Sequence, residues 1–165
     1  MIACVDVDYR GEGAVAACVL LRAWADGDSA GEHVERIARV EEYRPGQFYR
    51  RELPCLLSVL AGVGARPAAV VVDGYVWLGD GGAPGLGAHL YEALGRAVPV
   101  VGVAKTRFAG AAAAREVLRG ASRKPLFVTA AGMDADEAAR HVLGMHGPYR
   151  IPTALKRVDQ LCRTS

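Results

Sequence analysis

The sequence lacks several features that mark specialised classes of protein. It has four cysteines and no CxxC pair, which argues against the common zinc sites. Cys4, Cys18 and Cys55 stand inside apolar runs and are predicted to be buried thiols. No apolar run approaches the ~20 residues that a membrane-spanning helix needs, and no signal peptide precedes the first predicted strand. These absences predict a reduced, cytoplasmic protein with no membrane segment.

Strong charge is also missing. The 165 residues carry a net charge of +2 and only three lysines, so no strongly basic composition marks a nucleic-acid partner. Most basic residues are arginine, which suits bidentate phosphate contacts, although a bias in the base composition of the gene explains this equally well. Hydrophobic residues make up 52% of the chain, enough for a core. We therefore expect a single domain over residues 1–165.

The first part of the chain predicts strands joined by short turns. Residues 2–8, 14–24 and 32–40 are rich in residues that favour strands. Gly11 and Gly13 suit a hairpin turn between the first two, and residues 26–28 suit a turn before the third. Three such strands would form an antiparallel meander.

The second part alternates helices and strands. The leucines at 53, 56, 57 and 60 lie on one helical face, with Pro54 expected in the first turn. Residues 68–72 form an apolar run typical of a strand buried on both faces. A helix around residues 86–94, strands at 98–103 and 126–129, and helices at 135–143 and 151–162 follow. The predicted fold is α/β: a mixed sheet with helices on both faces.

Four carboxylates stand where the local pattern favours apolar residues. Asp6 lies on the same strand face as Ile2 and Cys4, and Asp73 ends the run of residues 68–72. Glu52 precedes the leucines of the predicted helix, and Asp159 falls on the apolar stripe of the last helix. Buried carboxylates are costly unless they are paired or bind a metal, so these four predict one converging site.

Carboxylate oxygens are ligands that suit Mg²⁺ or Mn²⁺, and such ions serve phosphoryl chemistry. Taken singly, each acid also has an ordinary explanation. Glu52 suits the N-terminal end of a helix, Asp73 suits a turn before Gly74, and Asp159 has arginines nearby to pair with. Asp6 is the hardest of the four to explain in this way.

Several segments, in order and over nearly the whole chain, resemble the endonuclease V family. Cys4-Val5-Asp6-Val7-Asp8-Tyr9 resembles its first strand, and Val70-Val71-Val72-Asp73-Gly74 resembles its third acidic motif. The others are Tyr43-Arg44-Pro45-Gly46 with Arg51-Glu52-Leu53-Pro54, residues 85–90, Val101-Gly102-Val103-Ala104-Lys105, and Gly147 with Tyr149-Arg150-Ile151-Pro152 and Asp159.

This resemblance implies a ribonuclease H-like fold and a hydrolase that cuts a phosphodiester near a deaminated purine, inosine, in DNA or RNA. It implies that Mg²⁺, with Mn²⁺ as a substitute, is held by Asp6, Glu52, Asp73 and Asp159. Lys105 would lie near the scissile phosphate as a further catalytic residue. The implied substrate-binding residues are Tyr43, which would stack as a wedge beside the extruded nucleotide, Arg51, Gly46 and Gly74.

The chain departs from the family pattern after Asp73. The family continues Gly-x-Gly-x-x-His-Pro-Arg, whereas here Val76 replaces the second glycine and Gly79 replaces the histidine. Tyr75 and Trp77 are candidates to stack on bases there, or to form an apolar contact surface. We also expect this domain to lack the helical segment that usually precedes the first strand in the family, because the first predicted strand begins almost at the first residue.

These departures leave three functions to compare. The first is the metal-dependent endonuclease for deaminated purines. The second is a nucleic-acid-binding protein that keeps the fold and has lost lesion recognition. The third is a ribonuclease H-like nuclease of structured strands that reads no modified base. The candidate phosphate contacts in all three are arginines, namely Arg44, Arg50, Arg51, Arg107, Arg123 and Arg150.

Overall fold

The structure is a computed structural model that describes residues 1–110 and 113–165. Within these residues, seven strands form one mixed sheet in the order β3-β2-β1-β4-β7-β9-β8. The strands are β1 (Ile2–Arg10), β2 (Gly13–Leu21), β3 (Gly31–Ile37), β4 (Ala69–Asp73), β7 (Val100–Ala104), β8 (Arg115–Val117) and β9 (Leu126–Ala131). The predicted antiparallel meander is confirmed as β1, β2 and β3.

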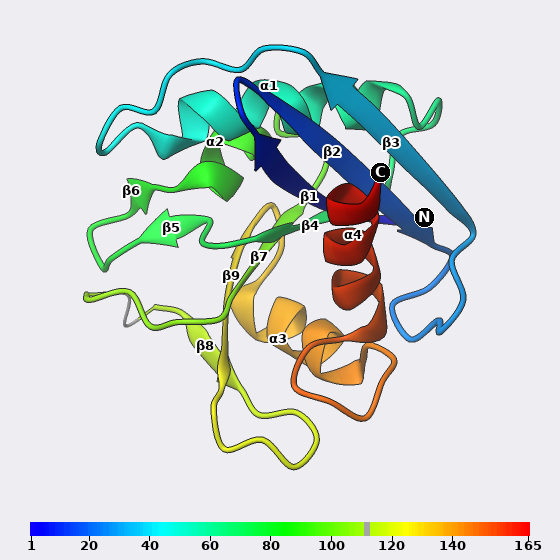
Figure 1. Ribbon diagram of the computed structural model, residues 1–165. Coiled ribbons are helices and arrows are strands. Elements are labelled where there is room, and N and C mark those ends of the chain that lie inside the picture. Colours follow the sequence, from blue (N-terminus) through cyan, green and yellow to red (C-terminus); the bar gives the residue numbers. More distant parts are fainter. Residues whose placement is uncertain (111–112) are drawn as a thin grey trace.

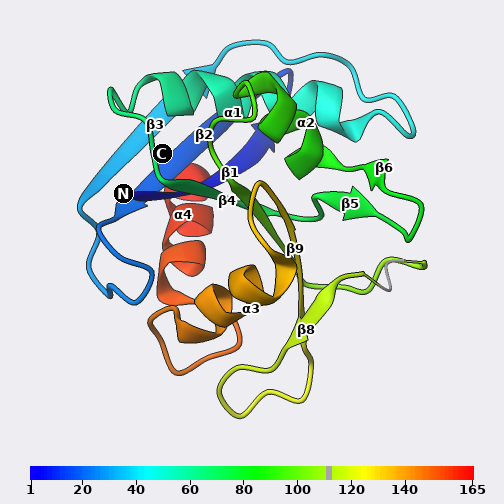
Figure 2. The same ribbon diagram turned by 180° about the vertical axis from the view of Figure 1, so that it is seen from behind.

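The remaining elements are a small hairpin and four helices. The hairpin pairs β5 (Trp77–Leu78) with β6 (Ala83–Pro84). The helices are α1 (Phe48–Ala61), α2 (Leu86–Ala93), α3 (Ala135–Gly144) and α4 (Thr153–Thr164). Figures 1 and 2 show α1 and α2 on one side of the sheet and α3 and α4 on the other, so the predicted two-sided helical cover is confirmed.

Alternation along the strands builds a core on each face. In β1, Ile2 and Cys4 pack with α3 and α4, whereas Ala3 and Val5 pack with α1 and α2. Both faces of the central strands are therefore covered, which explains their unbroken apolar sequences. Among the described residues, no helix is long and apolar enough to cross a bilayer.

The order of the strands brings three chain segments to one edge. β4 lies between β1 and β7 and is parallel to both, and Val5 pairs with Val72. The next residues, Asp6 and Asp73, therefore stand at the same level where β4 ends and β1 continues. Their side chains lie on the same side of the sheet as those of Cys4 and Val71, and this is the side that α4 covers.

Several boundaries differ from the sequence prediction. β2 ends at Leu21, before Trp24, whose ring instead stacks on His141 with centroids 4.6 Å apart. α1 begins at Phe48, so Glu52 and Pro54 lie inside the helix and not at its start. Pro54 is tolerated there because it is exposed, so the carbonyl that loses a partner is open to water.

The far edge of the sheet was also predicted incompletely. β9 runs antiparallel to β7, and β8 pairs antiparallel with β9, so in the part of the chain that the structure describes parallel pairing joins only β1, β4 and β7. β5, β6 and β8 have two or three residues each, which is too short for hydrophobic alternation to reveal them.

Candidate metal and phosphodiester site

Three of the predicted acids line one cleft. Asp6, Asp73 and Asp159 border a cavity of about 320 Å³, together with Lys105. They come from the middle of β1, the carboxyl end of β4 and the middle of α4. The sheet edge and α4 thus bring together residues that are up to 153 positions apart in the chain.

Glu52 approaches this group from the other side of the sheet. It lies in α1 with only 7% of its surface exposed. Burial, together with the charges of Asp6 and Asp73, raises the pKa of Glu52 to about 8. Because β4 ends at Asp73, the Glu52 carboxylate can approach Asp6 and Asp73 from the opposite face of the sheet.

Asp6 has the same electrostatic character. The pKa of Asp6 is raised to about 6, mainly by burial and also by the charges of Asp73 and Asp159. The hydrogen bond from Val7 N, 2.9 Å from Oδ1, and the charge of Lys105 act in the opposite direction. The mutual repulsion of these carboxylates is only partly offset by nearby cations. An additional cation between them would relieve it.

Two cations already occupy part of the site. Lys105 Nζ lies 3.0 Å from Asp73 Oδ2, and Arg163 Nε lies 2.8 Å from Asp159 Oδ1. Over the described part of the chain, no three histidine, cysteine or carboxylate side chains are close enough to share one ion in this arrangement. The two ion pairs help to keep the acids apart, because each turns one carboxylate toward its own basic partner.

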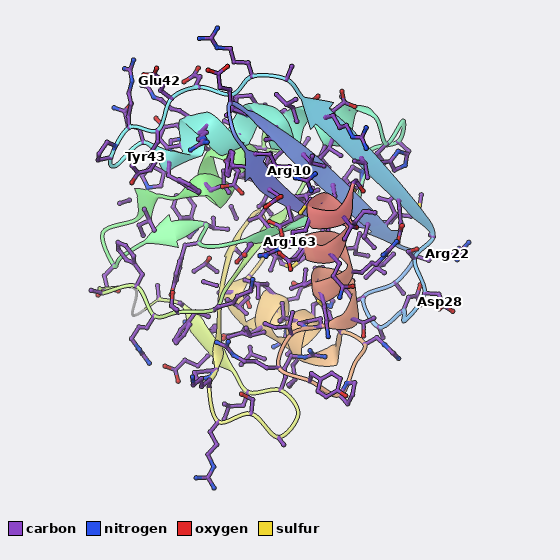
Figure 3. All side chains as sticks on the ribbon, viewed as in Figure 1. Arg10, Arg22, Asp28, Glu42, Tyr43 and Arg163 are labelled. Atoms are coloured by element: carbon purple, nitrogen blue, oxygen red, sulfur yellow. The ribbon has the colours of Figure 1, made fainter. Side chains whose placement is uncertain are left out.

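Of the predicted substrate-binding residues, Tyr43 and Gly46 lie before α1, Arg51 lies in its first turns and Gly74 directly follows β4. Tyr43 is 58% exposed, and Figure 3 shows it at the outer edge of the molecule beside Glu42. Gly46 and Gly74 have φ of +76° and +111°, and a side chain at either would point into open space. Arg51 lies with its guanidinium 4.1 Å from the centre of the Tyr9 ring.

The loop after Asp73 is anchored to the rest of the protein by hydrogen bonds from its aromatic side chains. Tyr75 is buried, and its hydroxyl donates to Thr106 O and accepts from Phe108 N. Trp77 donates from Nε1 to Ala130 O at 2.9 Å. The buried Tyr75 ring is therefore not available to stack on a base, which corrects that expectation.

The predicted arginine contacts divide into two groups. Arg44, Arg50 and Arg123 are exposed and remain candidate phosphate contacts. Arg150 instead donates to the carbonyls of Lys105, Lys124 and Pro125, and Arg107 pairs with Glu116. These last two arginines shape the border of the site.

Sequence reasoning missed the residue that holds the α4 side of the cleft together. Arg119 is 4% exposed and donates to four main-chain carbonyls of the segment before α4, those of Met145, Gly147, Tyr149 and Arg150. No acid partners it in sequence or in space among the described residues, so no charge pattern pointed to it. It fixes the segment that carries Tyr149 and Arg150 to the cleft.

We expect Arg119→Met to lower the free energy of unfolding by about 3 kcal/mol, because it leaves buried carbonyls without donors. Urea unfolding measures the change. The exposed Arg123→Met is the matched control and should change stability by less than ~0.5 kcal/mol. Equal effects of the two substitutions would contradict this role.

Comparison with known proteins identifies the family. The sequence model of the endonuclease V family matches residues 1–160. The chain belongs to the endonuclease V family. Endonuclease V of Rhodospirillum centenum is 33% identical over 141 residues, which cover 72% of this chain and 57% of that protein. The chain therefore matches less than two thirds of this relative's length.

Solved structures give the same family fold. Endonuclease V of Streptomyces avermitilis is 30% identical, with a TM-score of 0.79 over 99% of this chain and 79% of the other. Endonuclease V of Ciona intestinalis is 19% identical, with a TM-score of 0.84 over 99% and 83% of the two chains. The ribonuclease H-like fold that the sequence predicted is thereby confirmed.

Proposed function

We propose that this endonuclease V family member is a divalent-metal-dependent endonuclease that hydrolyses a phosphodiester near a deaminated purine, inosine, in DNA or RNA. Such an activity would serve nucleic-acid repair or processing. The observation that carries the proposal is a cleft lined by three carboxylates from β1, β4 and α4, with the buried Glu52 of α1 close enough for the charges of Asp6 and Asp73 to raise its pKa.

The donor set fits a hard cation. Asp6, Glu52, Asp73 and Asp159 would hold Mg²⁺ or Mn²⁺, since carboxylate oxygens are preferred by these ions. Glu52 and Asp6 carry pKa values raised by burial and by neighbouring acids, so they are costly to ionise without a cation. When bound, such an ion polarises the phosphate and lowers the pKa of a water ligand.

Lys105 is proposed to act on the phosphate. Its ammonium lies 3.0 Å from Asp73 and lines the cleft, so it can exchange that carboxylate for a phosphate oxygen. There it would balance the negative charge that develops during hydrolysis. The Asp73–Lys105 pair would thus keep both side chains in place before substrate binds.

We expect Lys105→Met to separate metal binding from catalysis. Cleavage should fall about 100-fold, because a charge that stabilises the transition state is lost. Mn²⁺ affinity, measured by calorimetry, should stay equal or become tighter, because Asp73 loses its competing cation. Lys124→Met is the exposed control and should leave both unchanged. Loss of Mn²⁺ binding in Lys105→Met would contradict the assignment.

Inosine recognition is proposed for the surface that carries Tyr43, Gly46, Arg51 and Gly74. The Ciona intestinalis relative was solved with a 23mer DNA containing an inosine followed by a ribo-adenosine. Tyr43 is exposed here, as a wedge between bases requires. The open space at Gly46 and Gly74 allows a base edge to approach the main chain.

One observation favours a second candidate, a nuclease that does not read a modified base. Val76 replaces a family glycine, is fully buried, and donates from N to Thr129 Oγ1 at 2.8 Å. A lesion pocket that depended on that glycine would be altered. The remaining alternative, a nucleic-acid-binding protein without activity, gives no reason for Glu52 and Asp6 to be placed beside other acids at the cost of raised pKa values.

Cleavage of labelled single strands separates these functions. Strands with and without inosine are incubated with Mg²⁺, Mn²⁺ or EDTA. The proposal predicts metal-dependent cleavage of the inosine strand in preference to the undamaged one. Equal cleavage of both strands supports the second candidate, and no cleavage with either ion contradicts nuclease activity.

A cytoplasmic location stays a prediction. All four cysteines are free and buried, as a reducing compartment favours. Burial raises the pKa of Cys18 and of Cys162 to about 12, so neither is a reactive thiol at neutral pH.

A further inference from the structure

The cavity at the acids also has apolar walls that the proposed reaction does not use, and we call this apolar part the chamber. Asp6, Asp73, Asp159 and Lys105 border it. Apolar residues of β7 and of α4 with its preceding segment form other parts of the wall, namely Val103, Ile151, Leu155 and Val158. The whole cavity, acids included, has a volume of about 320 Å³, at the lower end of the ~300–1,000 Å³ range of small-ligand sites.

The border of this chamber carries an exposed aromatic ring on a fixed main chain. Tyr149 is 70% exposed and lines the cleft. Its carbonyl accepts a hydrogen bond from Arg119 at 2.8 Å, and Arg150 is tied to Pro125 O at 3.0 Å. Because the main chain at Tyr149 is already fixed, only the side-chain torsions of the ring need to be ordered when a flat partner stacks on it.

The charges around the chamber suit a nucleotide strand. Lys105 and Lys156 both line it, so phosphates on either side of a bound base would meet a cation. The walls themselves are apolar, which favours the faces of a base without selecting among bases. A nucleobase attached to a phosphate backbone matches this combination better than a free anion or a purely apolar ligand.

The position of the chamber indicates which nucleotide along a bound strand would place its base there. Residues of α4 and of the segment before it line the chamber, whereas Tyr43 lies on the segment before α1, at an outer edge of the molecule away from α4 (Figures 1 and 3). The acids lie between the two regions, since Asp6 neighbours both Glu52 of α1 and Asp159 of α4. A strand that crosses the acids therefore has one nucleotide on each side.

We propose that the chamber of Tyr149, Ile151 and Leu155 is a nucleobase subsite. It takes, without sequence preference, the base of a nucleotide across the scissile phosphate from the one held near Tyr43. This inference rests on the proposed function. It assigns the chain a second base contact, which would position the phosphate between two anchored nucleotides.

An abasic scan tests the subsite. Single strands carry one inosine and, at one position at a time, a nucleotide without a base. With the wild-type chain, kcat/KM should fall about tenfold at one position beside the cleaved bond, as expected for the loss of one stacked base. Leu155→Trp, which fills the chamber, should lower kcat/KM on the intact strand and remove the further loss at that position.

Two other variants keep the test decisive. Tyr149→Ala removes a largely exposed ring, so it should fold normally and also weaken the abasic effect. Leu143→Trp, at an exposed position of α3, is the matched control and should behave as wild type. If wild type cleaves all abasic strands equally, or if Leu155→Trp keeps the full abasic loss, the subsite is overturned although the nuclease proposal stands.

A binding measurement distinguishes failure of the subsite from failure of the proposed function. The fluorescence of 2-aminopurine, placed in turn at each position of the strand, is recorded with Ca²⁺ in place of Mg²⁺. A change at one position that Leu155→Trp and Tyr149→Ala abolish supports the subsite even if no strand is cleaved. The absence of such a position, in a strand that binds, overturns it.

Discussion

Asp6→Asn is expected to lower cleavage of an inosine-containing strand by about a thousandfold. The substitution removes a proposed metal ligand and a negative charge from the centre of the acid group, while the side chain keeps its size. The hydrogen bond from Val7 N to Oδ1 can be kept by the amide oxygen, so the strand end is preserved. Single-turnover cleavage with saturating Mg²⁺ measures the effect.

Asp8→Asn is the matched control, because Asp8 lies on the same face of β1 two residues further along. It pairs with Arg10 at 3.1 Å on the surface and does not line the cleft. We expect cleavage within about twofold of wild type, since a surface ion pair contributes little to stability. Equal losses in the two variants would mean that the β1 acids matter for the fold or the surface charge and not for a metal.

Glu52→Gln is expected to abolish cleavage and, at pH 8, to stabilise the metal-free fold. Burial and the nearby Asp6 and Asp73 raise the pKa of Glu52 to about 8, so its charged form is unfavourable in the folded state. An amide of the same shape avoids this cost. We expect a gain of about 2 kcal/mol, or roughly 4–8 °C in Tm, less than the whole pKa shift implies because water and side chains relax around the charge.

The pH dependence of this gain has a definite sign. In the unfolded chain Glu52 titrates near ~4.3, whereas the folded value is about 8, so between these values the folded state binds more protons. The wild type therefore loses stability as pH rises from about 4 to about 8. Thermal unfolding at several pH values should show the two proteins converging at pH 4 and separating toward pH 8.

Mg²⁺ should reverse the order of stability. It binds the folded wild type and restores the stability that its carboxylates cost, whereas Glu52→Gln should gain less from the same concentration. Glu42→Gln, an exposed position before α1, is the control and should follow wild type at all pH values. A Glu52→Gln protein that is less stable than wild type at pH 8 without metal would contradict the assigned electrostatics.

Much of the sheet could be predicted from sequence because alternation and apolar runs are local signals. Val70 to Val72 marked a central strand, and the polar Asp73 after them marked its end. Asp6 was conspicuous because it interrupts the apolar face of β1. The role of these residues could be predicted because it depends on the residues next to them in the sequence.

The start of α1 could not be predicted, and this changed the reading of Glu52. Gln47 makes no side-chain capping hydrogen bond, and the first turn carries no acid, so the usual signals of a helix start are missing. From the leucines alone, the helix was predicted to begin near Leu53, whereas it begins at Phe48. Glu52 therefore seemed to be a helix-terminal acid, although it lies within the helix and is buried by the sheet below.

The α4 side of the site depends on contacts between distant residues. Arg119 bonds carbonyls about 26–31 positions away, and a carbonyl has no signature in the sequence. Trp77 is held by Ala130 O in the same way. The resemblance named Tyr149 and Ile151 as a motif, but the chamber that they border exists only when α4 packs on the sheet.

Anomalous diffraction from crystals soaked in Mn²⁺ tests the central claim most directly. The account predicts a manganese peak at the cleft with carboxylate oxygens of Asp6 and Asp73 about 2.0–2.2 Å away, which requires Asp73 to turn from Lys105 toward the ion. Glu52 or Asp159 should complete the protein ligands. A saturating soak that leaves the cleft without manganese, or a peak held by surface acids elsewhere, would contradict the shared metal site.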